Sequence, residues 1–383
     1  MRPANRRMRR AAGVSASAVL LLAMTACTGD GVVTVDLDRD KPFRLAGVSD
    51  VTEVAQLTGP DAINDTAAVS VAGTDLGSMV NLGDRTLFLF GDTFGERDPE
   101  SIGGQGGFWR SNVAAWSTDE DPTDGITFDG WVEDELGLAA ALVEGDHDAN
   151  GAGGEVTKIP THGFAVGDSI YVAYMSVRHW GEPGAWETNH SALIVSRDGG
   201  VSWSPVPDVQ WPGDSGFIQF SAVAVRDGGR DYVYIWAIPA GRFGGVSLMR
   251  VPAVEADVED PGAYEYFAGL DGQAPRWSSV LADAQQVVEG TIGEHSVMWS
   301  TYLERWIMTY SDAGSAYIRE GATPWGPWGE PIELVSRDDY PGLYSPYLNP
   351  RYVSDDGRTI HFTLSLWGPY NVFWFSAELD RMP

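Results

Sequence analysis

The sequence contains one cysteine, few histidines and few basic residues. Its 383 residues include 6 His, 25 Lys or Arg and 54 Asp or Glu. A single cysteine cannot form a disulfide within the chain, so stability must come from a hydrophobic core. The scattered histidines include no H-x-x-x-H pair, so no catalytic zinc site is expected. We predict no cofactor, although the many carboxylates and carbonyls could hold a structural Ca²⁺ that no spacing requires.

The shortage of basic residues makes the chain strongly acidic. Its formal charge of −29 repels nucleic acid and anionic lipid head groups, so neither is expected as a partner. A neutral polymer, such as an uncharged polysaccharide, is compatible with this charge. The 15 Trp and 14 Tyr suit stacking on sugars, although aromatics in such numbers are more often core and strand residues.

The N-terminus has the pattern of a targeting segment. Residues 1–26 begin with five arginines and continue with an apolar stretch over 11–26 that is short for a membrane span. The stretch ends in M-T-A-C at Cys27, which resembles the lipobox of bacterial lipoproteins, in which the signal is cut before a lipidated cysteine. The alternative is an ordinary signal peptide that happens to contain a cysteine. We expect residues 27–42 to be an acidic linker, with the domain of residues 43–383 lipid-anchored at the extracellular face of the cytoplasmic membrane.

Residues 73–95 predict a hairpin of two antiparallel strands. The first strand starts near Asp75, Gly83-Asp84 forms the turn, and an apolar run over 86–90 leads to Asp92. Pairing of positions that sum to about 168 places Asp75 and Asp92 together on one rim. Glycoside hydrolysis needs two such carboxylates, one as acid and one as nucleophile or base. The alternative is that both are ordinary strand-end residues that make turn hydrogen bonds.

The second strand of this hairpin recurs, and each copy follows a turn and precedes a further strand. The five copies are Thr86–Phe90, Ser169–Met175, Asp231–Ile238, Arg305–Tyr310 and Arg358–Leu366. Five repeats of three or four strands predict an all-β fold, a five-bladed β-propeller, with a two-sheet sandwich as the alternative. Residues 196–203, SRDGGVSW, match the Asp-box hairpin of sialidase-like propellers, which we interpret as structural.

In a propeller the starts of the inner strands meet at one mouth, which brings further carboxylates toward Asp75. Glu294 holds the position in the fourth blade that Asp75 holds in the first. Asp312 follows the second strand of the fourth blade, and Glu155 starts the inner strand of the second. We predict Glu294 as a catalytic candidate and Glu155 as a candidate for substrate binding. Each could instead be a solvated strand end.

Loops after the blade strands supply aromatic and polar side chains to the same mouth. The candidates for substrate binding are Trp180, Trp186, Asn189, His190, Arg242, Trp367 and Tyr370. A sugar offers C–H faces to aromatic rings and hydroxyls to amide and imidazole groups. The alternatives are that the aromatic residues plug loops and that Arg242 belongs to a structural ion pair.

The order of short motifs along the chain resembles a bacterial family. The motifs include T-D-L-G (74–77), F-G-D-T-F (90–94), W-R-S-N (109–112), W-x-T-N-x-S (186–191), A-G-R (240–242), G-E-x-S (293–296) and Y-N-V-F (370–373). The family was long catalogued as a domain of unknown function, and its members are recognised as endo-D-arabinanases that cut the D-arabinan of mycobacterial-type cell walls. The resemblance covers about residues 48–379.

This resemblance implies a five-bladed propeller and endo-hydrolysis of α-D-arabinofuranosyl linkages in arabinogalactan or lipoarabinomannan. By motif, the family's catalytic aspartates fall on Asp75 and Asp92. Related five-bladed glycosidases take a Glu from another blade as the acid, which implies that role for Glu294. The resemblance leaves open the stereochemical outcome, the role of each aspartate, and the linkage and chain-length preference.

Other functions also remain open at this stage. The chain could be a non-catalytic carbohydrate-binding propeller lipoprotein, a glycosidase acting on another furanoside, or a scaffold for a protein partner. No G-x-S-x-G elbow, phosphate loop or dinucleotide fingerprint stands in a strand-to-helix context. We expect a monomer that meets a neutral polysaccharide and touches the membrane only through its N-terminal lipid.

Overall fold

The computed structural model describes residues 32–35, 40–148 and 154–383. The predicted signal segment and Cys27 lie outside these residues. Within the predicted linker, β1 (Val33–Thr34) pairs in parallel with β13 (Gln219–Asp227), so this part of the segment lies against the domain. None of the helices in the described ranges is long and apolar enough to cross a membrane.

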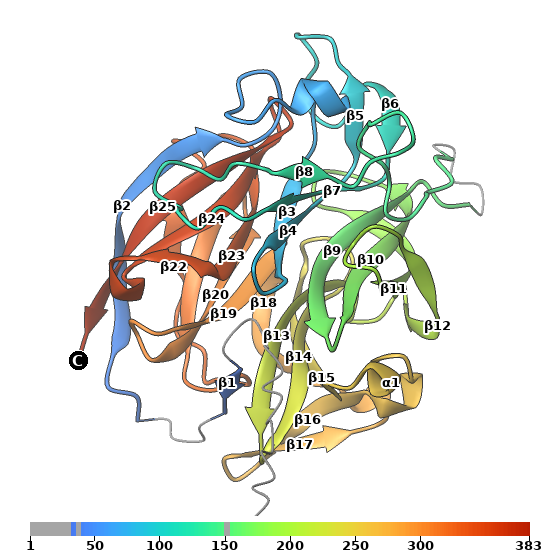
Figure 1. Cartoon of the computed structure of the whole chain (residues 1–383). Coiled ribbons are helices and arrows are strands. Elements are labelled where there is room, and N and C mark those ends of the chain that lie inside the picture. Colours follow the sequence, from blue (N-terminus) through green and yellow to red (C-terminus); the bar gives the residue numbers. More distant parts are fainter. Residues whose placement is uncertain (1–31, 36–39, 149–153) are drawn as a thin grey trace, which may run out of the picture.

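Nearly all regular structure is β-strand, arranged in sheets around a central axis (Figure 1). In the described residues, four sheets have four antiparallel strands each. In the spatial order of their strands, the first sheet contains β3 (Leu76–Asn81), β4 (Thr86–Phe90), β7 (Val113–Ser117) and β8 (Gly130–Trp131), and the second contains β9 (Thr157–Val166), β10 (Ser169–Trp180), β11 (Trp186–Ser196) and β12 (Ser204–Pro212). The third sheet contains β19 (His295–Ser300), β20 (Arg305–Asp312), β21 (Ser315–Gly321) and β22 (Ile332–Val335). The fourth contains β23 (Leu343–Ser354), β24 (Thr359–Leu366), β25 (Asn371–Met382) and β2 (Arg44–Gln56). The strand β2 thus joins the last sheet and ties the two ends of the domain together.

The remaining structure departs from this pattern. The strands β1, β13, β14 (Arg230–Ile238), β15 (Gly244–Pro252), β16 (Glu265–Asp271), β17 (Ala274–Ser278) and β18 (Gln286–Ile292) form a seven-stranded sheet. A two-stranded sheet contains β5 (Thr93–Glu96) and β6 (Gly107–Arg110). Within the described residues, helical structure is limited to α1 (Glu255–Val258) and 3₁₀ turns at Thr66–Val69, Pro261–Ala263, Leu281–Asp283 and Asp355–Gly357.

The prediction of an all-β propeller is confirmed, but the prediction of five blades is wrong. Four sheets in the described part of the chain have the regular four-stranded form, not five. The repeat centred on β14 differs because β1 pairs with β13, while residues 253–292 add β16, β17 and β18 beside β15. The insertion therefore enlarges one sheet beyond a regular blade.

Neighbouring sheets pack face to face, which explains why their middle strands are apolar on both sides. Every residue of β4 is buried, and its Phe88 packs near Tyr352 of the adjacent sheet with ring centroids 6.1 Å apart. Trp236 of β14 and Trp306 of β20 pack in the same way at 5.3 Å. The sequence of a strand that is covered on both faces is a nearly continuous hydrophobic run. This packing in a ring of sheets rules out the two-sheet sandwich.

The Asp-box hairpin is structural, as predicted. Asp198 Oδ1 accepts hydrogen bonds from the Ser196 hydroxyl at 2.8 Å and from the Ser202 backbone amide at 2.9 Å. The Trp203 indole donates to the Gly200 carbonyl, and its ring packs on the core between the sheets of β4 and β10. The motif therefore closes a turn at the end of a blade.

The predicted hairpin forms with nearly the predicted register. Met79 pairs with Phe88 and Asn81 with Thr86, so paired positions sum to 167 near the turn instead of 168. A β-bulge between Leu76 and Ser78 shifts the register by one more residue, and Gly77 adopts a φ of 87° that favours glycine. Asp75 therefore lies opposite Gly91, whose amide donates to the Asp75 carbonyl at 3.2 Å.

Candidate active site

Three predicted carboxylates meet where β3 and β19 begin and β4 ends. Burial, together with the neighbouring charges of Asp92 and, to a smaller extent, Glu294, raises the pKa of Asp75 to about 8. Asp92 and Glu294 are themselves buried. The fold thus brings Asp75, Asp92 and Glu294 into one electrostatically coupled cluster.

Asp75 is bound by a tyrosine from the last sheet. The Tyr344 hydroxyl donates to Asp75 Oδ2 at 2.9 Å. Burial and the charge of Asp75 raise the pKa of Tyr344 well above its usual value, so its phenol stays protonated and acts as a hydrogen-bond donor. Asp75 Oδ1 is buried and has no hydrogen-bond partner among the described residues. Tyr370, predicted to bind substrate, lies beside Asp75, because burial and the charge of this carboxyl raise the pKa of its phenol.

Asp92 is held by two donors on one oxygen. The Trp109 indole N–H donates to Asp92 Oδ1 at 2.8 Å, and the Thr157 hydroxyl donates to the same atom at 2.5 Å. Burial raises the pKa of Asp92 to about 7, although both hydrogen bonds favour its ionised form. The ring of His147 stacks on Trp109 with centroids 4.1 Å apart.

Glu294 is bound by Arg242 rather than free at the mouth. Arg242 Nε lies 3.0 and 3.1 Å from the two carboxylate oxygens, and Nη2 donates to Oε1 at 2.7 Å. The guanidinium also lies over the rings of Trp186 and Tyr344, at 5.8 and 5.3 Å from their centroids. Arg242 was predicted to bind substrate, and the structure places its Nε and Nη2 in the ion pair with buried Glu294.

The ion pair allows a stability prediction. Replacing Arg242 by Met leaves Glu294 buried without its cation, which we expect to lower the free energy of unfolding by about 2–4 kcal/mol. The double replacement Arg242→Met with Glu294→Gln is expected to recover at least half of that loss, because no charge is then buried. Urea unfolding measures both values. Equal losses in the single and double variants would show that the unpaired charge is not the cause.

Glu155 forms a second polar group beside the cluster. Lys158 Nζ lies 2.6 Å from Glu155 Oε1, and the Ser176 hydroxyl donates to Oε2 at 2.5 Å. The Asn189 amide donates to the Ser176 hydroxyl at 3.1 Å, which connects β9, β10 and β11. His190 packs edge-on to Tyr174 at 6.1 Å. Glu155, Asn189 and His190 thus lie together in the second blade.

The rim aspartate of the fourth blade has other partners. Asp312 Oδ1 accepts a hydrogen bond from the Thr291 hydroxyl at 2.8 Å, at the end of β20. No hydrogen bond or ion pair connects Asp312 with the other predicted carboxylates among the described residues. We therefore leave Asp312 outside the candidate site.

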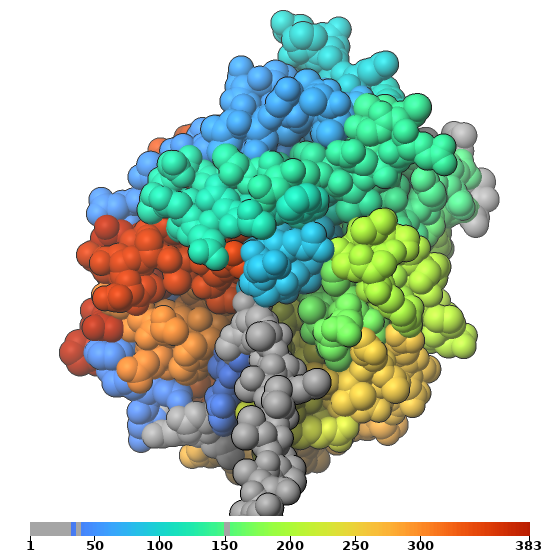
Figure 2. Space-filling model, viewed as in Figure 1, coloured from blue at the N-terminus to red at the C-terminus, as the bar shows by residue number. Residues whose placement is uncertain are grey.

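A hollow of about 370 Å³ opens beside Asp92. It is lined by Asp92, Phe94, Gly104, Gln105, Gly106, Trp109, Val156, His179 and Trp180. One wall is the β5–β6 hairpin, which projects from this end of the molecule (Figures 1 and 2). Trp180 is 41% exposed and packs edge-on to Trp186 with centroids 5.6 Å apart. An exposed indole beside a carboxylate can stack on a sugar ring.

Arg97, which the sequence reading missed, organises this wall. Its guanidinium donates to the carbonyls of Gly103 at 2.6 Å and Ser101 at 3.2 Å, and it lies 5.4 Å from the centroid of Tyr370. Trp367 is 51% exposed and packs edge-on to Tyr370 with centroids 5.7 Å apart. The hairpin loop is thereby joined to Tyr370, which lies beside Asp75.

Other site residues had partial signals or none. Trp109 and Gly91 lie in the motifs W-R-S-N and G-D-T, respectively. These motifs did not reveal what the two residues do in the site. Tyr344 and Thr157 come from other sheets than Asp75 and Asp92, and nothing in their spacing reveals these contacts.

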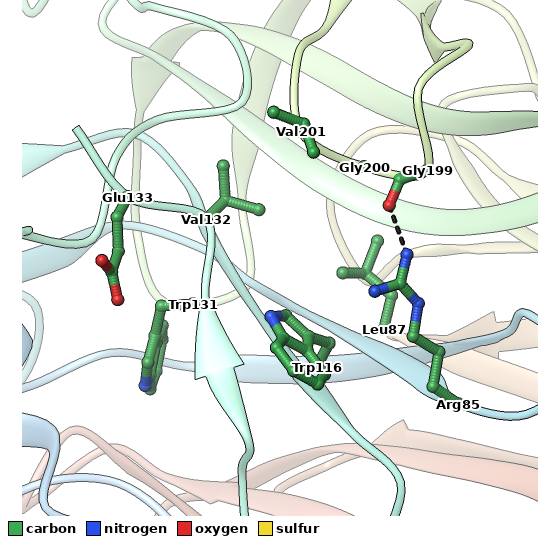
Figure 3. Close-up of a pocket in the computed structure, with 9 residues that line it drawn as sticks. All are labelled: Arg85, Leu87, Trp116, Trp131, Val132, Glu133, Gly199, Gly200 and Val201. Carbon is green, nitrogen blue, oxygen red and sulfur yellow. Dashed lines mark hydrogen bonds between the residues drawn. The ribbon is translucent and has the colours of Figure 1, made fainter. Parts of the chain in front are cut away.

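A second hollow, of about 150 Å³, lies away from these residues. Its lining comprises Arg85, Leu87, Trp116, Trp131, Val132, Glu133, Gly199, Gly200 and Val201, where Arg85 donates to the Gly199 carbonyl at 2.5 Å (Figure 3). It contains no predicted site residue. In the described part of the chain, no cluster of three or more His, Cys, Asp or Glu is arranged to hold a metal ion.

The raised pKa of Asp75 predicts a pH-dependent stability. An unfolded aspartate ionises near 3.8, whereas folded Asp75 keeps its proton up to about 8, so the stability of the wild type falls as pH rises between these values. Asn cannot ionise and still accepts from Tyr344. We expect Asp75→Asn to raise the free energy of unfolding by up to about 5 kcal/mol at pH 8.5 and to change it little at pH 4. A gain of equal size at both pH values in denaturant unfolding would contradict this reading.

The fold and site together define an all-β propeller with clustered carboxylates at one end. The chain belongs to the family described as "Domain of unknown function (DUF4185)", which matches residues 61–376. No curated protein matches the sequence.

Solved structures similar to this chain include the following three. A hydrolase candidate from Bacteroides ovatus has a TM-score of 0.51 and 11% identity, with 82% of this chain and 88% of that chain covered. A family 117 glycoside hydrolase from Zobellia galactanivorans has a TM-score of 0.48 and 11% identity, with coverage of 88% and 92%. An endo-arabinase from Bacteroides thetaiotaomicron has a TM-score of 0.42 and 11% identity, with coverage of 82% and 96%. The first likeness supports the fold, and at these identities it concerns the fold alone.

Proposed function

We propose that this protein is a glycoside hydrolase that cuts within D-arabinan, at α-D-arabinofuranosyl linkages of arabinogalactan or lipoarabinomannan. The observation that carries the proposal is the pairing of Asp75 and Asp92, two buried carboxyls with raised pKa values beside an aromatic hollow. Enzymes raise carboxyl pKa values in this way to obtain an acid that works near neutral pH. The motif resemblance to endo-D-arabinanases supplies the substrate.

The charges around the site support a neutral substrate. Arg242 is paired with Glu294, and Lys158 is paired with Glu155. Arg97 points its guanidinium at loop carbonyls. These cations of the described mouth are thus engaged, whereas an anionic sugar needs free ones.

In the proposed reaction one carboxyl protonates the glycosidic oxygen, and the other meets the anomeric carbon directly or through water. Glu294 and Arg242 set the charge beside the pair, and Tyr344 orients Asp75. We further propose a monomeric lipoprotein anchored through Cys27 on the extracellular face of the membrane, where it meets wall polysaccharide directly.

The substrate is tested by comparing polysaccharides. We expect the protein to release oligosaccharides from mycobacterial arabinogalactan and none from linear α-1,5-L-arabinan, with Asp92→Asn as the inactive control. If the protein cleaves L-arabinan and not arabinogalactan, its substrate is another furanoside and the D-arabinan proposal is wrong. Tight binding of arabinogalactan without cleavage would favour a carbohydrate-binding propeller.

The exposed indole of Trp180 predicts a binding effect. Trp180→Ala removes a stacking surface in the hollow, so we expect KM for D-arabinan to rise about 10-fold with kcat little changed. The matched control is Val201→Ala, an exposed residue of the remote hollow, which should leave both constants unchanged. An unchanged KM in Trp180→Ala would place the sugar chain elsewhere.

A further inference from the structure

The two aspartates differ in how their oxygens are bound. Asp92 Oδ1 accepts from both Trp109 and Thr157, at 2.8 and 2.5 Å. Among the residues that the structure describes, none donates to Asp92 Oδ2, and Asp92 lines the hollow. One oxygen of Asp92 is therefore fixed, while the other is left for solvent or a ligand. Two donors on a carboxylate stabilise its negative charge.

Asp75 has the opposite arrangement. Its Oδ2 accepts from Tyr344 at 2.9 Å, but its Oδ1 is buried without a donor. A buried oxygen that receives no hydrogen bond disfavours the negative charge, and so do the neighbouring charges of Asp92 and Glu294. The proton that such a pair shares is thus more stable on Asp75 than on Asp92.

We propose that Asp75 carries the proton of the pair and acts as the acid, that Asp92 carries the negative charge and meets the anomeric carbon, and that Trp109 and Thr157 are positioning residues for Asp92. This assignment rests on the proposed function. The proton of Asp75 passes to the glycosidic oxygen while the bond from that oxygen to the anomeric carbon breaks, and the bonding electrons leave with the oxygen. Asp92 then either bonds to the anomeric carbon, to be displaced later by water, or accepts a proton from the attacking water.

Other titratable groups around Asp92 do not compete for this role. Glu155 is paired with Lys158, and Glu294 is paired with Arg242. His147 stacks on Trp109, and burial lowers its pKa, so it is neutral near pH 7. His179 lines the same hollow, and Tyr344 donates to Asp75.

The charge placement can be measured without turnover. The ¹⁵N-labelled indole of Trp109, identified by its loss in Trp109→Phe, reports the ionisation of Asp92 by NMR. We expect its signal to titrate near pH 7, to keep this step in Asp75→Asn because protonated Asp75 is as uncharged as Asn, and to lose it in Asp92→Asn. A titration step of the Trp109 signal above pH 8, or a step that persists in Asp92→Asn, would overturn the assignment of the negative charge to Asp92. His147→Gln identifies any step that comes from the stacked imidazole.

The roles are then separated by the leaving group. A 4-nitrophenyl glycoside of an α-D-arabinofuranosyl oligosaccharide has a leaving group that needs little protonation. We expect Asp75→Asn to lose about 10²–10⁴-fold on D-arabinan but only about 10-fold on this glycoside, whereas Asp92→Asn loses both activities. The reverse pattern, in which Asp92→Asn keeps activity on the glycoside and Asp75→Asn loses both activities, would overturn the assignment. If the wild type cleaves neither compound, the proposed function fails, while the NMR titration still decides where the charge lies.

The positioning role of Trp109 has its own test. Trp109→Phe keeps a ring in place but removes the donor, so we expect kcat to fall about 10-fold and the Asp92 limb of the pH profile to move upward, with KM little changed. Trp211→Phe is the matched control, because its buried indole donates to Tyr266 far from the cluster. A rise in KM with an unchanged pH profile would show that Trp109 only contacts sugar.

Discussion

Asp75→Asn and Asp92→Asn are each expected to lower the rate of D-arabinan hydrolysis by about 10²–10⁴-fold. Each replacement removes one member of the carboxyl pair but keeps an amide oxygen for the tyrosine, indole or hydroxyl donors. The fold should therefore survive, and thermal unfolding near neutral pH should show Asp75→Asn at least as stable as the wild type. Reducing-end release from arabinogalactan measures the rates.

The control for this pair is Asp312→Asn. Asp312 lies on the same predicted rim, but its carboxylate bonds to Thr291 outside the cluster. Its rate should stay within about threefold of the wild type, well below the loss expected for a catalytic group. Full activity in Asp75→Asn or Asp92→Asn would remove the carboxyl pair from the mechanism.

Gly91→Ala is expected to lower the rate by about 10²-fold although residue 91 has no functional group. A Cβ built on Gly91 would lie 2.3 Å from Asp75 Oδ1, so the carboxylate would have to move. Displacement of a reacting group by about 1 Å costs a factor of this size. Kinetics of D-arabinan hydrolysis and denaturant unfolding would be measured together, because the crowding also costs about 1–3 kcal/mol.

Gly47→Ala serves as the matched control. Gly47 lies in β2, and its nearest neighbour would be an ordinary 3.5 Å from the added Cβ. It should therefore change neither rate nor stability appreciably. A folded Gly91→Ala protein with wild-type kinetics would show that the position of Asp75 Oδ1 does not matter.

The sequence predicted the centre of the site because local register determines it. Asp75 and Asp92 flank one hairpin, so counting residues from the turn was enough to bring them together. The register differed by one residue already at the turn, and the bulge between Leu76 and Ser78, which was not recognised beforehand, shifted it by one more. Glu294 was found by its equivalent place in another blade.

Contacts between sheets could not be predicted by counting residues along one hairpin. Tyr344 reaches Asp75, and Thr157 reaches Asp92, from strands far away in sequence. Arg242 was assigned to substrate because its loop lies at the mouth, and its ion pair with Glu294 was only the alternative. The seven-stranded sheet was missed because the insertion over 253–292 lies outside the repeat that was counted.

The most direct test of the central claim follows product size with time during incubation of the protein with purified mycobacterial arabinogalactan. If the protein is a glycoside hydrolase that cuts within D-arabinan, we expect an early fall in polymer size and a ladder of arabino-oligosaccharides. Each cut should create one new reducing end. A folded protein that releases no reducing ends from this polymer would contradict the account. Release of single arabinose units alone would contradict internal cleavage.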